Sequence, residues 1–167
     1  MLQDQVFAIG AARNEIDNDD QSIAYMALIE GDASLVTAQF MDEKLPALEL
    51  MQTLEASAAE IDQEELERSP ALLNAWMSFP YEQGAAFVAE VFSTGGWEAV
   101  NELYENPPVS TEQLLHPEKY GEDDPTAVTL PAGLAAALGD GWSEPLRDVW
   151  GEADLLLLLQ EALGDDA

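Results

Sequence analysis

The sequence predicts a mainly α-helical protein, folded as a single compact multi-helix domain with at most one short hairpin or edge strand. Apolar residues recur at three- and four-residue steps along most of the 167 residues, which places them on one face of an α-helix. Hydrophobic residues make up 47% of the chain, enough to form a core despite a formal net charge of -29.

The first long helix is expected at 20–42, after the acidic stretch "NEIDNDD". Asp19 or Asp20 is expected to cap its first N–H groups and to complement the positive end of the helix dipole. Pro46 marks its end, because proline cannot continue the hydrogen-bond ladder. A second helix is expected over "LPALELMQTLEASAAEI" at 45–61, where apolar residues again follow the helical spacing.

The middle of the chain is expected to alternate between helices and breaks. The stretch "DQEELERSP" at 62–70 is predicted to be an acidic linker that ends at a proline. A short helix should follow, and then a longer one over 81–93 that Gly95 and Gly96 stop. The stretch "WEAVNELYENPP" predicts a further short helix that ends at two prolines.

The last third of the chain contains the only segment that favours extended structure. "STEQLLHP" opens with a capping-box pattern and should form one or two helical turns. "GEDDPTAVTLP" at 121–131 alternates in character and predicts an extended piece, and the tail "EADLLLLLQEAL" predicts a helix. The aromatic residues recur at helical spacings, and we expect them to lie mainly in the core. They are Trp76, Trp97, Trp142, Trp150, Phe79, Tyr81, Phe87 and Phe92.

Charge and residue counts exclude several classes of function. The chain has 34 acidic and 5 basic residues, so nucleic-acid backbones and anionic membrane surfaces are not expected as partners. It has no cysteine, which excludes thiolate metal sites, and its single histidine, His116, cannot form a two-histidine metal site. No apolar run reaches the ~20 residues that span a bilayer, so membrane insertion is not expected. The stretch "MLQDQVFAIG" lacks the features of a signal peptide, and no compartment is assigned.

Two carboxylates, Glu30 and Asp32, stand in the apolar stretch "AYMALIEGDASLVTAQF" at 24–40. They fall on nearly opposite sides of the predicted helix, and neither has a basic residue three or four positions away. An ionised carboxylate in such surroundings is costly unless it is paired, hydrogen-bonded or metal-bound. For Asp32 we expect a helix N-terminus or a tyrosine hydroxyl as partner. For Glu30 two interpretations stay open: a functional acid, or a glutamate that touches solvent on a two-sided helix.

Several stretches, taken in order, carry a resemblance to a known family. They are "LQDQ" at 2–5, "ALIEGDAS" at 27–34, "FPYEQGAAFV" at 79–88, "GGWEAVNELYENPP" at 95–108, "STEQLLHPEKY" at 110–120 and "WGEADLLLLL" at 150–159. Together they resemble bacterial and archaeal gluzincin-like zinc metallopeptidases, whose pattern reads roughly HExxHALQDQ followed by a helix that contains EGDA. The resemblance divides the single domain 1–167 into a glutamate-helix region, 1–45, and a C-terminal helical subdomain, 46–167.

The sequence departs from that family where the HExxH motif would stand, directly before Leu2, because Met1 occupies this place. HExxH supplies two zinc-ligating histidines and the general base that activates the bound water. The resemblance implies that Glu30 corresponds to the third zinc ligand. It also suggests His116 and Tyr120 as candidates for stabilising the oxyanion in an intact enzyme. A structural role for His116, in which it holds its turn by hydrogen bonds to backbone, stays open beside this one.

The resemblance therefore implies the C-terminal helical portion of a zinc-dependent peptidase that is catalytically inactive as this chain. A catalytic zinc needs three protein ligands and an open position, so no cofactor is expected here. Zinc and a peptide or protein substrate belong to the intact enzyme. The alternative is a non-catalytic acidic module that binds proteins or peptides. A homo-oligomer formed through an exposed apolar face is a further hypothesis.

Overall fold

The computed structural model describes residues 2–59 and 63–164, and all regular structure within these ranges is helical. The elements are α1 (Leu2–Phe7), α2 (Ile9–Arg13), α3 (Asp19–Lys44), α4 (Ala47–Ala59), α5 (Gln63–Arg68), α6 (Ala71–Glu102), α7 (Glu112–Leu115), the 3₁₀ helix η1 (Pro117–Lys119), α8 (Leu134–Leu138) and α9 (Glu152–Leu163). The mainly α prediction is confirmed. Residues 121–131, predicted to be extended, form no strand in the described part of the chain and belong to a long loop.

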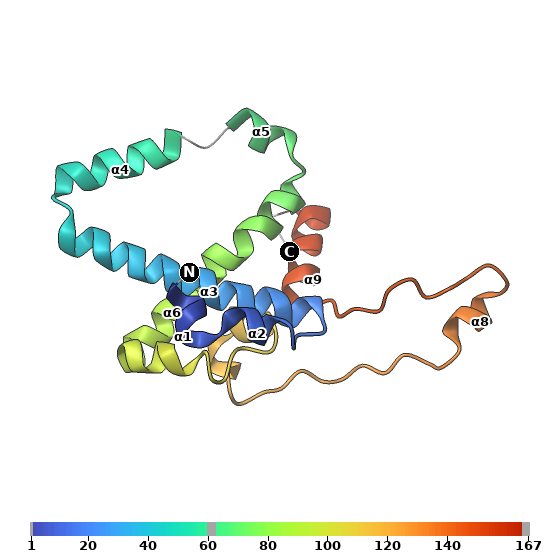
Figure 1. The fold of residues 1–167 in the computed structure, drawn as a ribbon. Coiled ribbons are helices and arrows are strands. Elements are labelled where there is room, and N and C mark those ends of the chain that lie inside the picture. The colour runs from blue at the N-terminus through green and yellow to red at the C-terminus, as the bar shows by residue number, and fades with distance from the viewer. Residues whose placement is uncertain (1, 60–62, 165–167) are drawn as a thin grey trace.

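The centre of the molecule is the crossing of the two longest helices, α3 and α6 (Figure 1). Their backbones approach so closely that a β-carbon on Gly31 would lie 2.2 Å from the carbonyl oxygen of Gly84. A β-carbon on Gly84 would lie 2.0 Å from the carbonyl oxygen of Ala27. Only glycine, which has no β-carbon, fits at these two positions. The "EGDA" and "EQGAA" stretches therefore contain the two residues that set the distance between the helices.

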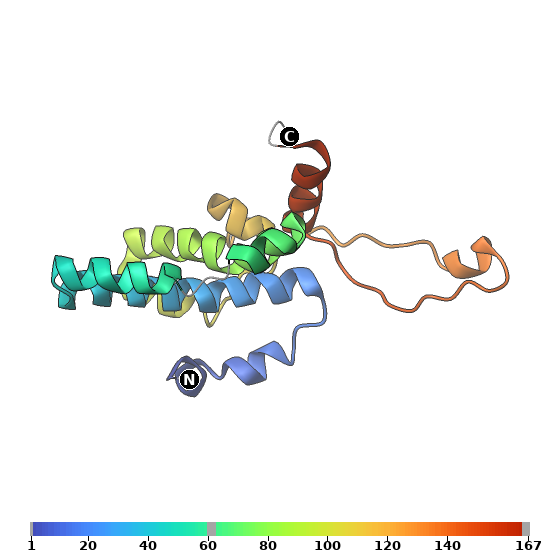
Figure 2. The ribbon, with the colours of Figure 1, turned by 90° about the horizontal axis from the view of Figure 1, so that it is seen from above.

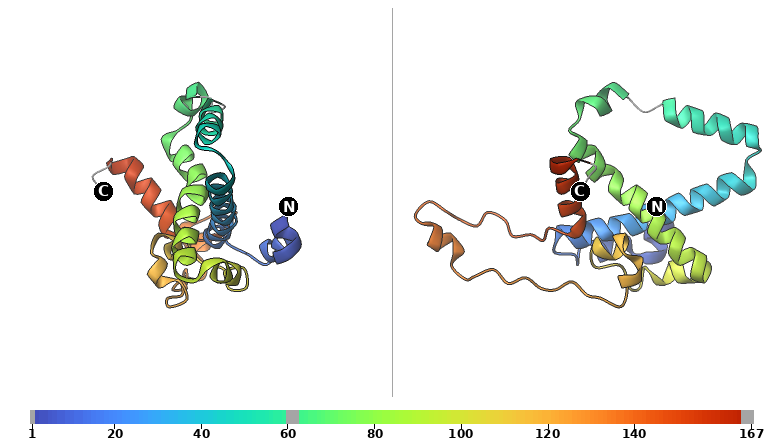
Figure 3. Two further views of the ribbon diagram at one scale, coloured as in Figure 1. Left: turned by 90° about the vertical axis from the view of Figure 1, so that its left-hand side faces the viewer. Right: turned by 180° about the vertical axis from the view of Figure 1, so that it is seen from behind.

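The other core elements pack around this crossing. Figures 2 and 3 show α1 and α2 on the side of α3 that faces away from α6. The helices α7 and α9 pack against α6. The largest side chains that are fully buried come from α3, from α6 and from the segment that follows α6. They are Tyr25, Leu28, Phe87, Val88, Val100, Leu103, Pro108 and Thr111.

Two segments extend away from the core. The arm formed by α4 and α5 joins the far end of α3 to the start of α6 (Figure 1), and no residue of α4 is buried. The loop between η1 and α9 projects from the other end of the molecule with the short helix α8 near its tip (Figures 1 and 2). In the described part of the chain, no helix has both the length and the apolar character needed to cross a bilayer.

The long helix expected at 20–42 is confirmed as α3, but its cap was assigned to the wrong residue. Asn18, with extended backbone angles, caps the helix by accepting a hydrogen bond at its side-chain oxygen from the Gln21 N–H (2.9 Å). Asp19 and Asp20 lie in the first turn instead, where their charges face the positive end of the helix dipole. The side chain of Asp20 then points inward and takes part in a buried contact described below.

Two predicted breaks between helices are not breaks in the structure. The expected acidic linker contains α5, in which Arg68 pairs with Glu64 one turn earlier at 2.7 Å. The short and long helices expected around residue 80 are one continuous helix, since α6 runs through Pro80. An internal proline costs about 3 kcal/mol, and burial of Phe79 and Pro80 beside the crossing offsets this cost.

The predicted stop at the glycine pair is confirmed in its position. Gly96 has φ 64° and ψ −158°, which interrupts the helical backbone, and regular turns then resume to Glu102. These last turns are the short helix expected from "WEAVNELY". The one or two helical turns expected over 110–117 are present as α7, followed directly by η1, and the helical tail is present as α9.

The expectation that the aromatic residues form the core is wrong for the tryptophans. All four are substantially exposed, from 37% at Trp97 to 65% at Trp150. Phe79 and Phe87 are buried as expected, but Tyr81 is exposed. Helical spacing alone does not reveal which side of a long helix meets a neighbour.

Candidate functional site

Asp32 is a buried carboxylate, 7% exposed, that is held by two donors from distant parts of the chain. Its Oδ2 accepts a hydrogen bond from the hydroxyl of Tyr104 (2.7 Å) and another from the side-chain amide of Gln3 (2.7 Å). The Gln3 amide also lies 3.3 Å from the carbonyl oxygen of Ile29. The expectation that a tyrosine hydroxyl satisfies Asp32 is therefore confirmed, and the second donor comes from α1.

The same contacts fix α1 against α3. The ring of Phe7 stacks on the ring of Tyr104 with centroids 3.9 Å apart and planes within 4° of parallel. Burial raises the pKa of Tyr104, and the hydrogen bond to the Asp32 carboxylate raises it further. The phenol therefore stays protonated and donates its hydrogen to Asp32 at neutral pH. One hydrogen-bonded and stacked unit thus joins α1, α3 and the end of α6.

A left-handed residue separates α1 from α2. Ala8 has φ 51°, a conformation that L-residues rarely adopt. The Asp4 side chain accepts a hydrogen bond from the N–H of Gly10 (2.9 Å), and this contact bridges the break. The chain can then turn so that α1 lies across α3, while α2 continues towards the start of α3 (Figure 2).

Glu30 lies on a different side of α3 from Asp32, as the helical spacing predicts. It is half-buried, and it forms no hydrogen bond or ion pair with any residue that the structure describes. Ile23 and Met26, which share its side of the helix, line a cavity between α3 and α6. Glu30 is thus a half-buried acid without a protein partner, in the turn of α3 that α1 contacts through Ile29 and Asp32.

The side chain of His116 is placed by acidic neighbours. Its Nε2 lies 3.0 Å from Oε1 of Glu152, the first residue of α9, and its Nδ1 lies 3.8 Å from Oε1 of Glu118. The structural alternative of hydrogen bonds to backbone is therefore wrong in its partner. A histidine that bridges η1 to the start of α9 serves to connect these elements.

Tyr120 is held by the segment that follows α6. Its hydroxyl donates to the carbonyl oxygen of Asn106, and its ring meets Phe87 edge-on at 5.5 Å. Burial raises the pKa of Tyr120, and the negative charge of Glu102 adds to this effect. Within the described residues, no hydrogen bond or ion pair joins His116 or Tyr120 to Glu30. Their role at an oxyanion stays a prediction.

A second buried carboxylate, Asp20, was not recognised from the sequence as a structural group. Its Oδ1 accepts hydrogen bonds from the Thr111 backbone N–H (3.0 Å) and the Thr111 hydroxyl (2.6 Å). The hydroxyl oxygen accepts in turn from the Ala153 N–H (3.1 Å). A β-carbon on Gly151 would lie 1.7 Å from Asp20 Oδ1, so this position requires glycine. Asp20 thereby links the start of α3 to the starts of α7 and α9.

The described residues do not assemble a metal site by themselves. No group of three or more histidine, cysteine, aspartate or glutamate side chains has suitable geometry in the described ranges. A catalytic zinc takes three protein ligands, and Glu30 could provide one of them. The residues that the structure describes therefore do not form a complete zinc centre. Compared with known proteins, the chain matches no family model, no curated protein and no solved structure.

Proposed function

We propose that this chain is the C-terminal helical portion of a gluzincin-like zinc-dependent peptidase, inactive by itself because it contains no HExxH motif. The contact of α1 with the turn of α3 that carries Glu30 supports this proposal most directly. Gln3 lies in the "LQDQ" stretch, which follows HExxH in the resembled pattern, and it reaches both Ile29 and Asp32. A helix that continues α1 backwards from Leu2 would therefore start beside this turn.

The spacing in the resembled pattern agrees with this arrangement. In HExxHALQDQ the second histidine precedes the position of Gln3 by three residues, and residues three apart share one side of a helix. That histidine would therefore lie one turn from Gln3, facing Ile29 and Asp32 on α3. Glu30 belongs to the same turn but to a different side of α3, so its side chain would have to reach around the helix to share a metal ion with this histidine. Glu30 is half-buried and has no protein partner among the described residues, which leaves its carboxylate free to ligate a metal.

Restoring the missing helix provides the test. In one variant, the six residues His-Glu-Ala-Ala-His-Ala are inserted directly before Leu2, and in a matched variant both histidines of the insertion are alanine. Zinc binding is measured by titration calorimetry for the two variants and for the natural chain. We expect one tight zinc site in the first variant, and none in the second or in the natural chain.

Substitution in the first variant shows whether Glu30 is a ligand. We expect Glu30→Gln to abolish the tight site and Glu43→Gln, an exposed glutamate later on the same helix, to leave it unchanged. Helical circular dichroism signals that match across the set show that the variants fold. Absence of a tight site in the folded first variant, or its survival after Glu30→Gln, would contradict the proposal.

A further inference from the structure

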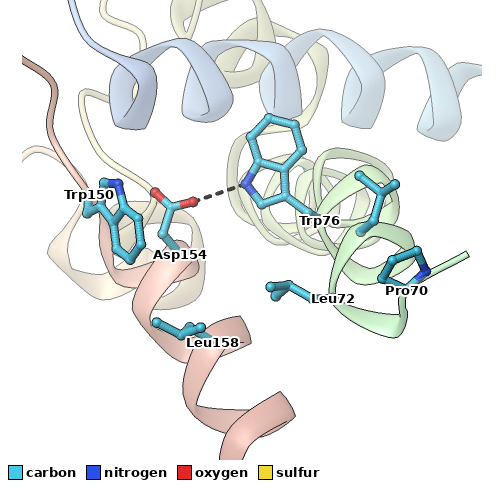
Figure 4. A pocket seen from close by; sticks show the side chains of 7 residues that line it. Pro70, Leu72, Trp76, Trp150, Asp154 and Leu158 are labelled. Carbon is cyan, nitrogen blue, oxygen red and sulfur yellow. Dashed lines mark hydrogen bonds between the residues drawn. The ribbon is translucent and has the colours of Figure 1, made fainter. Parts of the chain in front are cut away.

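Two apolar cavities meet at Trp76, near the start of α6. The first, of about 340 Å³, lies between α6 and α9, where Leu72, Leu73 and Leu158 contribute to its wall (Figure 4). The second, of about 300 Å³, lies between α6 and α3 and includes Met77. Trp76 lines both cavities and is 44% exposed. We call this surface, formed by the two cavities and Trp76, the tryptophan groove.

Carboxylates gather at the tryptophan groove. Asp154 lines the first cavity and accepts a hydrogen bond from the indole N–H of Trp76 (3.0 Å), as the dashed line in Figure 4 shows. Asp19 lines the second cavity. The backbone N–H of Asp19 donates a hydrogen bond to Oδ1 of Asp148 (2.8 Å), so this third carboxylate lies beside Asp19. The negative charge of Asp148 raises the pKa of Asp19, and that of Asp154 adds a smaller contribution.

No cation of the described chain neutralises these acids. None of the three forms an ion pair with a basic side chain in the described ranges. Arg147, the neighbour of Asp148, pairs with Glu144 through two hydrogen bonds. The lining residues of both cavities include no lysine or arginine within the described chain. The groove is therefore apolar in its walls and negative at its rim.

This combination restricts the occupant. A second copy of the chain would add another charge of -29 to the surface, so charge opposes self-association here. An anionic lipid surface meets the same repulsion. A basic amphipathic helix offers what the groove lacks, since its apolar side chains at helical spacing fit adjoining cavities and its lysines or arginines meet the carboxylates.

We propose that the tryptophan groove is a docking surface for a basic amphipathic helix of a partner protein. The proposal goes beyond the zinc-site proposal and does not depend on it, because no residue of the groove is a proposed zinc ligand. Apolar anchors enter the cavities on both sides of Trp76, and basic side chains lie along Asp19, Asp148 and Asp154.

The probe is a fluorescent peptide of roughly 18 residues, built from leucine and lysine with leucines at i, i+3, i+4 and i+7. A scrambled peptide of the same composition has the same charge without an apolar face. Binding is followed by anisotropy at ~0.15 M salt, where nonspecific charge attraction is screened. We expect the patterned peptide to bind the natural chain at least about tenfold more tightly than the scrambled one. Equal binding of the two peptides would overturn the proposal.

Matched substitutions locate the site. We expect Trp76→Ala to weaken binding of the patterned peptide about tenfold, and Trp142→Ala, on the projecting loop, to change it less than about twofold. Leu73→Ala should weaken binding, whereas Leu48→Ala on α4 should not. Because Leu73 is partly exposed, this variant keeps the test valid if Trp76→Ala unfolds the chain. Equal effects of groove and control variants would overturn the proposal.

Charge variants and sedimentation complete the test. Asp154→Asn keeps an oxygen that can accept the hydrogen bond from the Trp76 indole N–H. This variant should bind the patterned peptide more weakly than the control Asp140→Asn does, and its peptide binding should depend less on salt concentration. Sedimentation tests whether the natural chain self-associates through the groove. We expect any self-association of the natural chain to be unchanged by the groove substitutions. A dimer that Leu73→Ala dissolves would show that the occupant is a second copy, and would overturn the proposal. Stronger binding to anionic vesicles than to the patterned peptide would do the same.

Discussion

The α3–α6 crossing and the α4–α5 arm are both helical, but different physical terms stabilise them. At the crossing, two glycines bring the backbones together, and the surrounding side chains are almost fully buried. The arm has apolar residues at helical spacing, yet Leu48, Met51 and Leu54 are all more than half exposed. An apolar stripe therefore predicts a helix in both regions, and it predicts burial only where another element of the chain meets the stripe.

The largest expected effect contrasts one leucine from each region. Leu28→Ala empties a fully buried position at the crossing and should lower the free energy of unfolding by about 4 kcal/mol. Leu54→Ala, on the arm, should lower it by less than about 0.5 kcal/mol. Urea denaturation of both variants gives the comparison. Similar losses at the two positions would show that the arm is packed as tightly as the crossing.

The close approach of the helices is tested at the glycines. Gly84→Ala places a β-carbon against the carbonyl oxygen of Ala27 and should cost about 3 kcal/mol, because the helices must separate. Gly10→Ala is the matched control, since its β-carbon would meet Asp4 at an ordinary 3.5 Å. The control should change stability by less than about 0.5 kcal/mol or increase it. A neutral Gly84→Ala variant would contradict the crossing as described.

The polar contact that joins α1 to this core is the next strongest. Tyr104→Phe removes a donor from the buried Asp32 carboxylate and should lower the free energy of unfolding by about 2 kcal/mol. Tyr81→Phe, at an exposed tyrosine of α6, should have almost no effect. The same urea measurements apply. A loss of similar size in both variants would mean that the Tyr104 hydroxyl contributes nothing specific.

Alkaline pH should weaken the same contact gradually. Because the pKa of Tyr104 is raised in the folded state, the unfolded chain releases the phenol proton first, above about pH 10. Stability is therefore full below that pH and falls as the pH rises. This tyrosine contributes less than ~1.4 kcal/mol per pH unit, because its side chain is only partly buried and solvent screens it. The pH dependence above 10 should be shallower in Tyr104→Phe, and an unchanged slope would contradict the burial of the hydroxyl.

The smallest effect is expected at Glu30. Its half-buried carboxylate has no partner among the described residues, so Glu30→Gln should leave stability unchanged or raise it by about 0.5 kcal/mol. Thermal unfolding monitored by circular dichroism is sufficient. A clear decrease in the melting temperature would reveal a structural partner for Glu30 and weaken its interpretation as a metal ligand.

The sequence predicts most helices because their signals are local. Apolar spacing located α3, α4 and α9, and the break at Gly96 follows from a glycine pair. At Pro80, burial outweighs the local preference: the helix continues through the proline, which is buried together with Phe79. The helix α5 is a different case, because its i, i+4 ion pair is a local signal within the predicted linker.

The site could be predicted only in part. The need of Asp32 for a partner, either a helix N-terminus or a tyrosine hydroxyl, follows from a carboxylate in an apolar helix without a nearby base. The identity of the donors does not, since Gln3 and Tyr104 lie far from Asp32 in the chain and meet it only through the packing of α1 and α6. The same reason applies to Asp20 and Thr111, which are 91 positions apart.

Solution NMR tests most directly whether α1 is fixed on the turn of α3 that carries Glu30. We expect nuclear Overhauser contacts between the side-chain amide protons of Gln3 and the ring protons of Tyr104, and between the rings of Phe7 and Tyr104. If α1 instead gives no contacts to Tyr104 while the α3–α6 crossing is intact, this placement of α1 is contradicted.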